Sequence, residues 1–251
     1  MADLDQLLPP GAATSALDAL VATWPWDRAC DDRPFVVVNM VCSLDGRITL
    51  HGGSTGLGGE GDKAMFHGLR TVVDGVLAGT GTLAAERYGR LVRVPERRAA
   101  RAALGLAEDP VLVILSRSGR VPFQAPLFDE PAQRVAIVSA PGCVEVPGGV
   151  RADVAVLELE DPSPAAALRA VQASHGIRSV LCEGGPTINR ALIDAGLLDE
   201  LFLTLSPLLI AGEGDVQRIV AGRELDPPAR LRLLGVLRHE DELLLRYGVG
   251  G

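Results

Sequence analysis

The segment Glu183-Gly184-Gly185-Pro186-Thr187 follows an apolar run and precedes a predicted helix. Glycines at the exit of a strand let a ligand approach the main chain, because no Cβ stands in the way. Proline suits the first position of a helix, and the free N–H groups after it attract anions. The segment is therefore predicted to bind phosphate, with Glu183 facing a hydroxyl or an amine of a substrate. The alternative is an ordinary strand-to-helix turn.

A second turn of similar composition, Gly79-Thr80-Gly81-Thr82, also follows an apolar run. Two such turns at strand ends could bind the two ends of a dinucleotide, although the Gly-x-Gly-x-x-Gly fingerprint is absent. A simple turn that is capped by Thr82 is the alternative.

A third group of polar residues begins with Asn39 and continues to the Asp45-Gly46 turn. Asp-Gly is a strong hairpin signal, so the local pattern favours a turn role for Asp45. Ser54 and Thr55, in the glycine-rich loop that follows, could donate hydrogen bonds to an anion. The alternative for this loop is a mobile surface segment.

Two arginines, Arg70 and Arg93, are the basic residues that we expect beside this loop. Guanidinium groups suit the recognition of phosphate, because they offer paired donors in one plane. Either arginine alone is more typical of a solvated surface charge.

Apolar runs and helical patterns alternate along the chain and must position these residues. Strands are predicted at 34–50 (with a turn at Asp45-Gly46), 74–79, 111–116, 134–139, 152–159, 177–182 and 199–210, helices at 14–23, 62–72, 163–176 and 186–196, and a closing hairpin at 230–249. Strands that alternate with helices imply a parallel sheet, and the hairpin makes it mixed. We therefore expect one α/β domain with a mixed, mostly parallel central sheet.

The composition excludes several classes of protein. A net charge of −8 argues against a broad nucleic-acid surface. The four cysteines contain no CxxC pair and the four histidines no ligand spacing, so neither a disulfide framework nor a metal site is expected. With no signal peptide and no apolar segment of membrane-spanning length, the sequence predicts a soluble, cytoplasmic protein.

Three segments together, VNMVCSLDGRI, VDGVLAGTGTLAAERYGRLVR and LCEGGPTINRALIDAGLLDELFLTLSPLLIAGEG, resemble the pyrimidine reductases of riboflavin biosynthesis. The resemblance covers roughly Pro34 to Leu245. In bacteria these reductases form the C-terminal half of a bifunctional deaminase/reductase, and they share the dihydrofolate reductase fold. The zinc deaminase signature is absent here, so we expect a free-standing reductase. The resemblance implies a helical extension at 1–33 and a single, three-layer dihydrofolate reductase-like domain at 34–251.

The resemblance also implies a set of site residues. The cofactor would be NADPH, bound by Thr82, Glu86, Ser116, Arg117, Gly184, Gly185, Pro186, Thr187, Ile188 and Asn189, with Ser116-Arg117 beside the 2′-phosphate. Substrate-binding residues would be Asn39, Ser54, Thr55, Arg70, Arg93 and Glu183. The Gly184-Gly185 peptide is expected to be cis. The chain departs from the family at Glu86-Arg87-Tyr88, where the bifunctional enzymes have an acid pair and a proline.

The implied reaction is hydride transfer to C1′ of a phosphoribosylaminopyrimidine, which becomes the ribitylamino form. Arg70 and Arg93 would hold the 5′-phosphate, while Glu183 and Asn39 orient the substrate. Glu183 and Asp45 are the candidate catalytic residues, Asp45 as an aid to proton delivery. Two alternatives remain: a dihydrofolate or other pterin reductase, and a nucleotide-binding module without catalysis. We also expect a homodimer in which the strand LFLTLSPLLI forms part of the interface.

Overall fold

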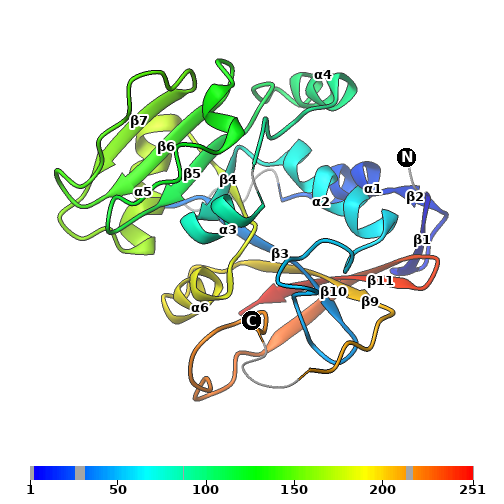
Figure 1. Cartoon of the computed structure of the whole chain (residues 1–251). Coiled ribbons are helices and arrows are strands. Elements are labelled where there is room, and N and C mark those ends of the chain that lie inside the picture. The colour runs from blue at the N-terminus through cyan, green and yellow to red at the C-terminus, as the bar shows by residue number, and fades with distance from the viewer. Residues whose placement is uncertain (1–2, 26–31, 87, 213–216, 251) are drawn as a thin grey trace. The chain divides into compact units, whose positions relative to one another are not determined.

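The computed structural model describes residues 3–25, 32–86, 88–212 and 217–250, and its elements are labelled in Figure 1. The residues form two compact units. Unit 1 comprises Met1–Pro25, Val36–Leu69 and Pro186–Gly251, and unit 2 comprises Trp26–Phe35 and Arg70–Gly185. The chain passes from unit 2 to unit 1 between Gly185 and Pro186, inside the segment predicted to bind phosphate.

The described residues of unit 1 form six strands in the order β2-β1-β10-β11-β9-β3. Adjacent strands pair in antiparallel fashion, except for β9 and β3, which are parallel. The strands are β1 (Asp3–Leu8), β2 (Thr14–Ser15), β3 (Phe35–Ser43), β9 (Glu200–Ser206), β10 (Leu231–His239) and β11 (Glu242–Val249). The helices that lie wholly or mainly in this unit are α1 (Ala16–Thr23), α2 (Glu60–Val72) and α6 (Pro186–Asp194).

In unit 2, the described part of the chain forms five parallel strands in the order β8-β4-β5-β6-β7. They are β4 (Gly75–Gly79), β5 (Val111–Leu115), β6 (Arg134–Ser139), β7 (Asp153–Glu158) and β8 (Ser179–Cys182), with helices α3 (Thr80–Ala85), α4 (Pro95–Ala103) and α5 (Pro164–His175) and the 3-10 helix η1 (Pro126–Asp129). β4, β5 and β8 are nearly continuous buried apolar runs, as is typical of parallel strands whose two faces are both covered.

Most predicted elements are present, and local chemistry explains their ends. Ser163 caps α5 by accepting a hydrogen bond from the Ala166 N–H, and Gly176 ends the helix in the left-handed conformation. The closing hairpin is formed by β10 and β11. Parallel strands with an antiparallel part confirm the predicted mixed α/β class.

Three local predictions differ from the structure. The second strand after Asp45-Gly46 is absent, and only an isolated bridge between Leu50 and Gly53 forms there. The residues before α1 form β1, which pairs with β10, so the first 25 residues contain strands as well as a helix. Helix α4 was not predicted, because charged residues dominate its sequence PERRAARAA and its alanines give only a weak apolar signal.

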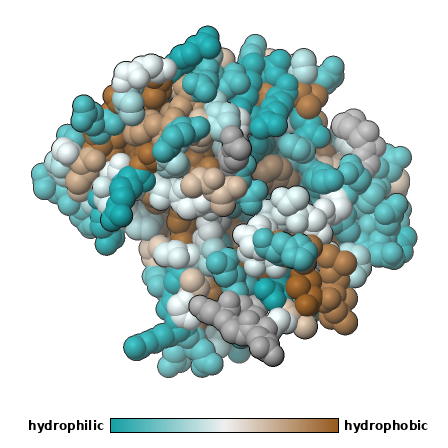
Figure 2. Space-filling model, viewed as in Figure 1, coloured by the Kyte–Doolittle hydropathy of each residue, from teal (hydrophilic) through white to brown (hydrophobic). Residues whose placement is uncertain are grey.

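The surface is mainly polar on the face drawn in Figure 2, where hydrophilic residues surround smaller apolar patches. In the part of the chain that the structure describes, no helix has the length and apolar character needed to cross a membrane.

Candidate active site

The candidate residues of unit 2 come from three neighbouring strands. β8, β4 and β5 are adjacent and parallel, so the segments that follow them emerge at one edge of the sheet. These segments begin with Glu183, Thr80 and Ser116. The carboxyl ends of parallel strands are where open α/β sheets bind ligands. The topology therefore gathers three of the predicted binding segments at one edge.

Glu183 and Arg70 form a buried ion pair with two parallel hydrogen bonds. Arg70 Nε lies 2.6 Å from Glu183 Oε1, and Arg70 Nη2 lies 2.7 Å from Glu183 Oε2. The Arg70 side chain is 10% exposed and the Glu183 side chain is 2% exposed. Burial disfavours the guanidinium charge, but the Glu183 carboxylate outweighs it and raises the pKa of Arg70. The Arg70 guanidinium therefore stays charged and directly faces the Glu183 carboxylate.

Tyr88 completes this pair, and the sequence reasoning did not assign it a role. Its hydroxyl donates a hydrogen bond to Glu183 Oε2, and the Arg70 guanidinium lies 5.2 Å from the centre of its ring. Burial and the nearby Glu183 carboxylate raise the pKa of Tyr88 well above its ordinary value, so the phenol remains a donor. The sequence signal was the departure at Glu86-Arg87-Tyr88. Arg87 lies outside the described residues.

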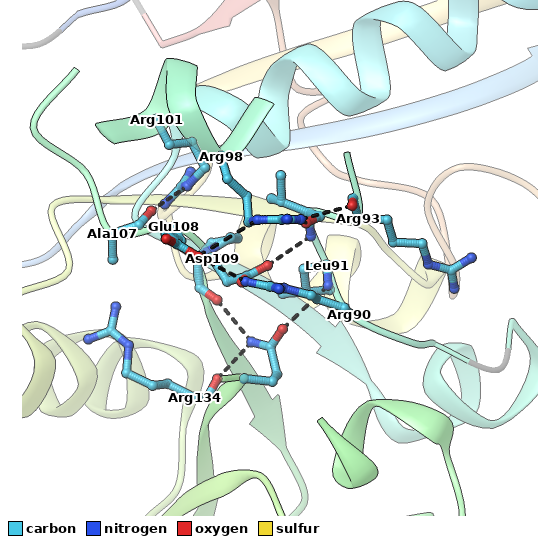
Figure 3. Close-up of polar contacts among 12 residues, drawn as sticks. Arg90, Leu91, Arg93, Arg98, Arg101, Ala107, Glu108, Asp109 and Arg134 are labelled. Atoms are coloured by element: carbon cyan, nitrogen blue, oxygen red, sulfur yellow. Dashed lines mark hydrogen bonds and ion pairs between the residues drawn. The ribbon is translucent and has the colours of Figure 1, made fainter. Parts of the chain in front are cut away.

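The segment 88–93 is held by hydrogen bonds along its main chain, as Figure 3 shows in part. The Leu91 N–H donates to Gln133 Oε1 (3.4 Å), and the Leu91 carbonyl accepts from Arg70 Nη1 (3.1 Å). The Val92 N–H donates to Asp109 Oδ1 (3.0 Å), while Asp109 Oδ2 binds Arg90 Nε (2.7 Å). The segment that carries Tyr88 is thereby fixed to Asp109, just before β5, and to Gln133, just before β6.

Arg101 fixes the main chain at Arg70. It is 1% exposed, and its Nη1 donates to the carbonyls of Arg70 and Val73, each at 2.7 Å. Burial lowers the pKa of Arg101 to about 10. The last turn of α2 thus has a cation at its negative end, which favours the position that Arg70 takes.

Arg93 has different surroundings from Arg70. It is exposed, and in Figure 3 its guanidinium points away from the Arg90 and Asp109 pair. Its side chain lies over Gly89, since a Cβ there would be 2.8 Å from Arg93 Nη2. Among the residues that the structure describes, the carbonyl of Arg93 accepts a hydrogen bond from Arg98 Nη1 at 2.8 Å. The guanidinium is accessible to an anion from solution.

The Gly184-Gly185 peptide is cis, as predicted, and Gly184 has a φ of 88°. A Cβ on Gly185 would lie 3.7 Å from Thr82 Oγ1, so this turn lies beside the turn after β4. Ser116 is buried at the end of β5, and Arg117 after it is exposed. Glu86 is exposed at the end of α3. Hydroxyl, guanidinium and main-chain donors are therefore present at this edge.

The other predicted cofactor residues, Pro186 to Asn189, form the first turn of α6 in unit 1. Asn189 is 1% exposed, and its Nδ2 donates to the carbonyl of Ile219 at 2.8 Å. The Pro186 carbonyl accepts from the Ala221 N–H at 3.2 Å. The Asn189 side chain thus holds the segment 219–221, while Thr187 is exposed at the helix start.

The Asp45 carboxylate accepts hydrogen bonds from nearby side-chain and main-chain groups. It accepts from the Ser43 hydroxyl at 2.5 Å and from the Ala211 N–H at 2.7 Å. These hydrogen bonds lower the pKa of Asp45 to about 2, so the group is ionised at neutral pH. The geometry favours a turn-stabilising role, and proton delivery by Asp45 stays a prediction.

Asn39, Ser54 and Thr55 also lie in unit 1. Asn39 is 9% exposed on β3, and its Oδ1 is buried without a hydrogen-bond partner in the part of the chain that is described. Ser54 and Thr55 lie in an exposed loop before α2, with Gly52 and Gly56 in left-handed conformations on either side. Their substrate contacts stay predictions.

Comparisons with known proteins agree with this arrangement. The chain is 28% identical to the 2,5-diamino-6-ribosylamino-4(3H)-pyrimidinone 5′-phosphate reductase of Methanothermobacter thermautotrophicus, over 87% of this chain and 100% of that protein. It is 31% identical to the reductase of the same name from Archaeoglobus fulgidus, over 72% and 83% of the two chains.

A solved structure shows the same fold. The pyrimidine reductase-like protein from Corynebacterium diphtheriae matches with a TM-score of 0.77 and 21% identity, over 95% of this chain and 100% of that one. This likeness confirms the predicted dihydrofolate reductase-like architecture. The family model described as the RibD C-terminal domain matches residues 34–245, most of the chain. The chain therefore belongs to the RibD C-terminal domain family.

Proposed function

We propose that this protein is an NADPH-dependent reductase that converts a 5-phosphoribosylaminopyrimidine to its ribitylamino form by hydride transfer to C1′. The observation that carries the proposal is the match to an archaeal pyrimidine reductase over the whole length of that relative. The segments after the strands of unit 2 would supply hydrogen-bond donors to a phosphorylated nucleotide. The exposed Arg93 would supply positive charge to a phosphorylated substrate.

The cofactor would be held by the donors at the edge formed by β8, β4 and β5. Thr82 and Ser116 offer hydroxyl groups, and the turn at Gly184-Gly185 leaves the main chain uncovered beside Thr82. Arg117 is the guanidinium available for a 2′-phosphate, which would favour NADPH over NADH. When bound, the reduced nicotinamide would supply the hydride.

On the substrate side, Arg93 would hold the 5′-phosphate. Glu183 has fixed geometry, because Arg70 and Tyr88 bind its two oxygens. A carboxylate that is held in this way could orient a hydroxyl or an amine of the substrate without having to reorganise. These assignments concern binding and orientation, and no residue is assigned as a general acid.

The test is an absorbance assay of NADPH oxidation by the purified protein. The substrates are the phosphorylated ribosylaminopyrimidine, in both its amino and its deaminated form, and dihydrofolate. Turnover of a pyrimidine is expected. Faster reduction of dihydrofolate would instead support a pterin reductase, and NADPH binding without any turnover would support a nucleotide-binding module.

We also propose that the protein is a homodimer that works in the cytoplasm. On β9, half-buried Leu203 and Leu205 alternate with buried residues, and they pair with the half-buried Leu245 and Leu243 of β11. These four leucines therefore share one face of the unit 1 sheet. Light scattering at micromolar concentration tests the dimer, and a monomeric mass would contradict it.

A further inference from the structure

Two side chains, Arg70 and Tyr88, bind the carboxylate of Glu183. Oε1 of Glu183 accepts from Arg70 Nε, and Oε2 accepts from both Arg70 Nη2 and the Tyr88 hydroxyl. The Glu183 side chain is only 2% exposed. A carboxylate with three charge-assisted or hydroxyl donors is held more firmly than one in a simple ion pair.

Tyr88 is itself held in place from two sides. Its carbonyl accepts from the Leu127 N–H at 2.8 Å, and the chain after it is fixed through Leu91 and Val92. The phenol ring lies under the Arg70 guanidinium, which is a favourable cation–π geometry. The hydroxyl thus reaches Glu183 from a rigid support rather than from a flexible loop.

The two arginines predicted to bind phosphate are therefore not equivalent. The charge of Arg70 is neutralised by Glu183, and its Nη1 is used by the Leu91 carbonyl. Arg93 is exposed over Gly89, and its guanidinium is accessible to solvent. Breaking the buried pair to free Arg70 would leave Glu183 uncompensated, at a high cost in free energy.

We propose that Tyr88 is a positioning residue that holds Glu183 on Arg70, so that the pair orients the substrate and Arg93 alone recognises its phosphate. The proposal rests on the proposed function, which it deepens by separating the roles of the two arginines. Tyr88 acts through Glu183 and does not itself contact the reacting atoms.

The first experiment compares Tyr88→Phe with the matched control Tyr247→Phe, which changes the chain's other tyrosine, half-buried on β11. The kinetic constants kcat and KM are measured for the pyrimidine with and without its 5′-phosphate. Tyr88→Phe should lower kcat about tenfold through the loss of one hydrogen bond to a charged group. It should leave the preference for the phosphorylated substrate within about twofold of the wild type, since the phosphate contact is elsewhere. The control should match the wild type.

Arg93→Ala should lower that preference at least about tenfold. A wild-type kcat in Tyr88→Phe would overturn the proposal. A loss of phosphate preference in Tyr88→Phe as large as that in Arg93→Ala would overturn it as well.

A double-mutant cycle separates positioning from a general structural effect. In the Glu183→Gln background, Tyr88→Phe should change kcat less than about twofold, because the hydroxyl acts through the carboxylate. Equal effects of Tyr88→Phe in the two backgrounds would show that Tyr88 acts independently of Glu183 and would overturn the proposal.

A tyrosine titration gives a readout that does not need activity. In Tyr247→Phe the only phenol is Tyr88, and its ionisation is followed by ultraviolet absorbance while circular dichroism monitors folding. Tyr88 should ionise at a higher pH than free tyrosine, and adding Glu183→Gln should move the ionisation to lower pH. Ionisation at the ordinary pH would overturn the hydrogen bond. If the wild type reduces no pyrimidine, the proposed function fails, and the titration alone decides whether Glu183 holds Tyr88.

Discussion

The guanidinium of Arg90 and the carboxylate of Asp109 form an ion pair, and the second oxygen of Asp109 holds the main chain two residues further on, at the Val92 N–H. One acid therefore fixes both a side chain and a peptide of the segment 88–93. Asp109 is 5% exposed, so its loss would leave the Val92 N–H buried and without its acceptor.

Asp109→Ala should lower the free energy of unfolding by about 2–3 kcal/mol. Denaturant unfolding measures this change. Glu108→Ala is the matched control, because Glu108 also pairs with Arg90 but its side chain is 68% exposed. The control should change stability by less than about 0.5 kcal/mol. Equal losses in the two variants would contradict the role assigned to Asp109.

Arg70→Ala should lower the free energy of unfolding by about 3–5 kcal/mol, because it leaves the Glu183 carboxylate buried without its cation. Arg93→Ala removes an exposed guanidinium and should cost less than about 0.5 kcal/mol. Thermal or denaturant unfolding of the two variants checks this difference. Similar stabilities would argue against a buried Arg70 and Glu183 pair in solution.

Arg117→Ala should raise KM for NADPH about tenfold or more while leaving KM for NADH nearly unchanged, because the guanidinium is proposed to bind only the 2′-phosphate. Steady-state kinetics with both cofactors measures the change. Arg120→Ala, three residues further on and also exposed, is the control and should match the wild type for both cofactors. A parallel loss with NADH would assign Arg117 to another part of the nucleotide.

Asp45 should contribute to the acid dependence of stability. Its pKa is lowered from 3.8 to about 2 in the folded chain by hydrogen bonds from Ser43 and Ala211. A depressed folded-state pKa gives stability that is present above pH 3.8 and is lost as pH falls toward about 2. Asp45→Asn should therefore flatten the stability curve in this window, as measured by unfolding at a series of pH values. Asp241→Asn, in the exposed turn between β10 and β11, should leave the curve unchanged.

Much of the fold could be predicted because its signals are local. β6 was predicted to the residue from a short apolar run, and α5 from Ser163 and Gly176 at its ends. β1 was missed because its two aspartates obscure the alternation of a strand, and its pairing with β10 joins opposite ends of the chain. α4 was missed because arginines dominate it.

The candidate site was only partly predictable, because some of its contacts join residues that lie far apart in the sequence. Glu183 and Arg70 could each be singled out by residue type and position. That they bind each other, and that Tyr88 joins them, depends on contacts over 113 and 95 residues of sequence. Such contacts follow from the order of the parallel strands and not from spacing along the chain.

Gly89 separates an inward-facing phenol from an outward-facing cation, and its bare Cα supports the guanidinium of Arg93. Alanine at this position would meet Nη2 at 2.8 Å, too close for both to stay. One added methyl would thus displace the Arg93 guanidinium, the proposed phosphate-binding group, while the buried side of the segment keeps its bonds. Under the role proposed for Arg93, position 89 therefore offers a change of selectivity towards uncharged sugars that leaves the scaffold intact.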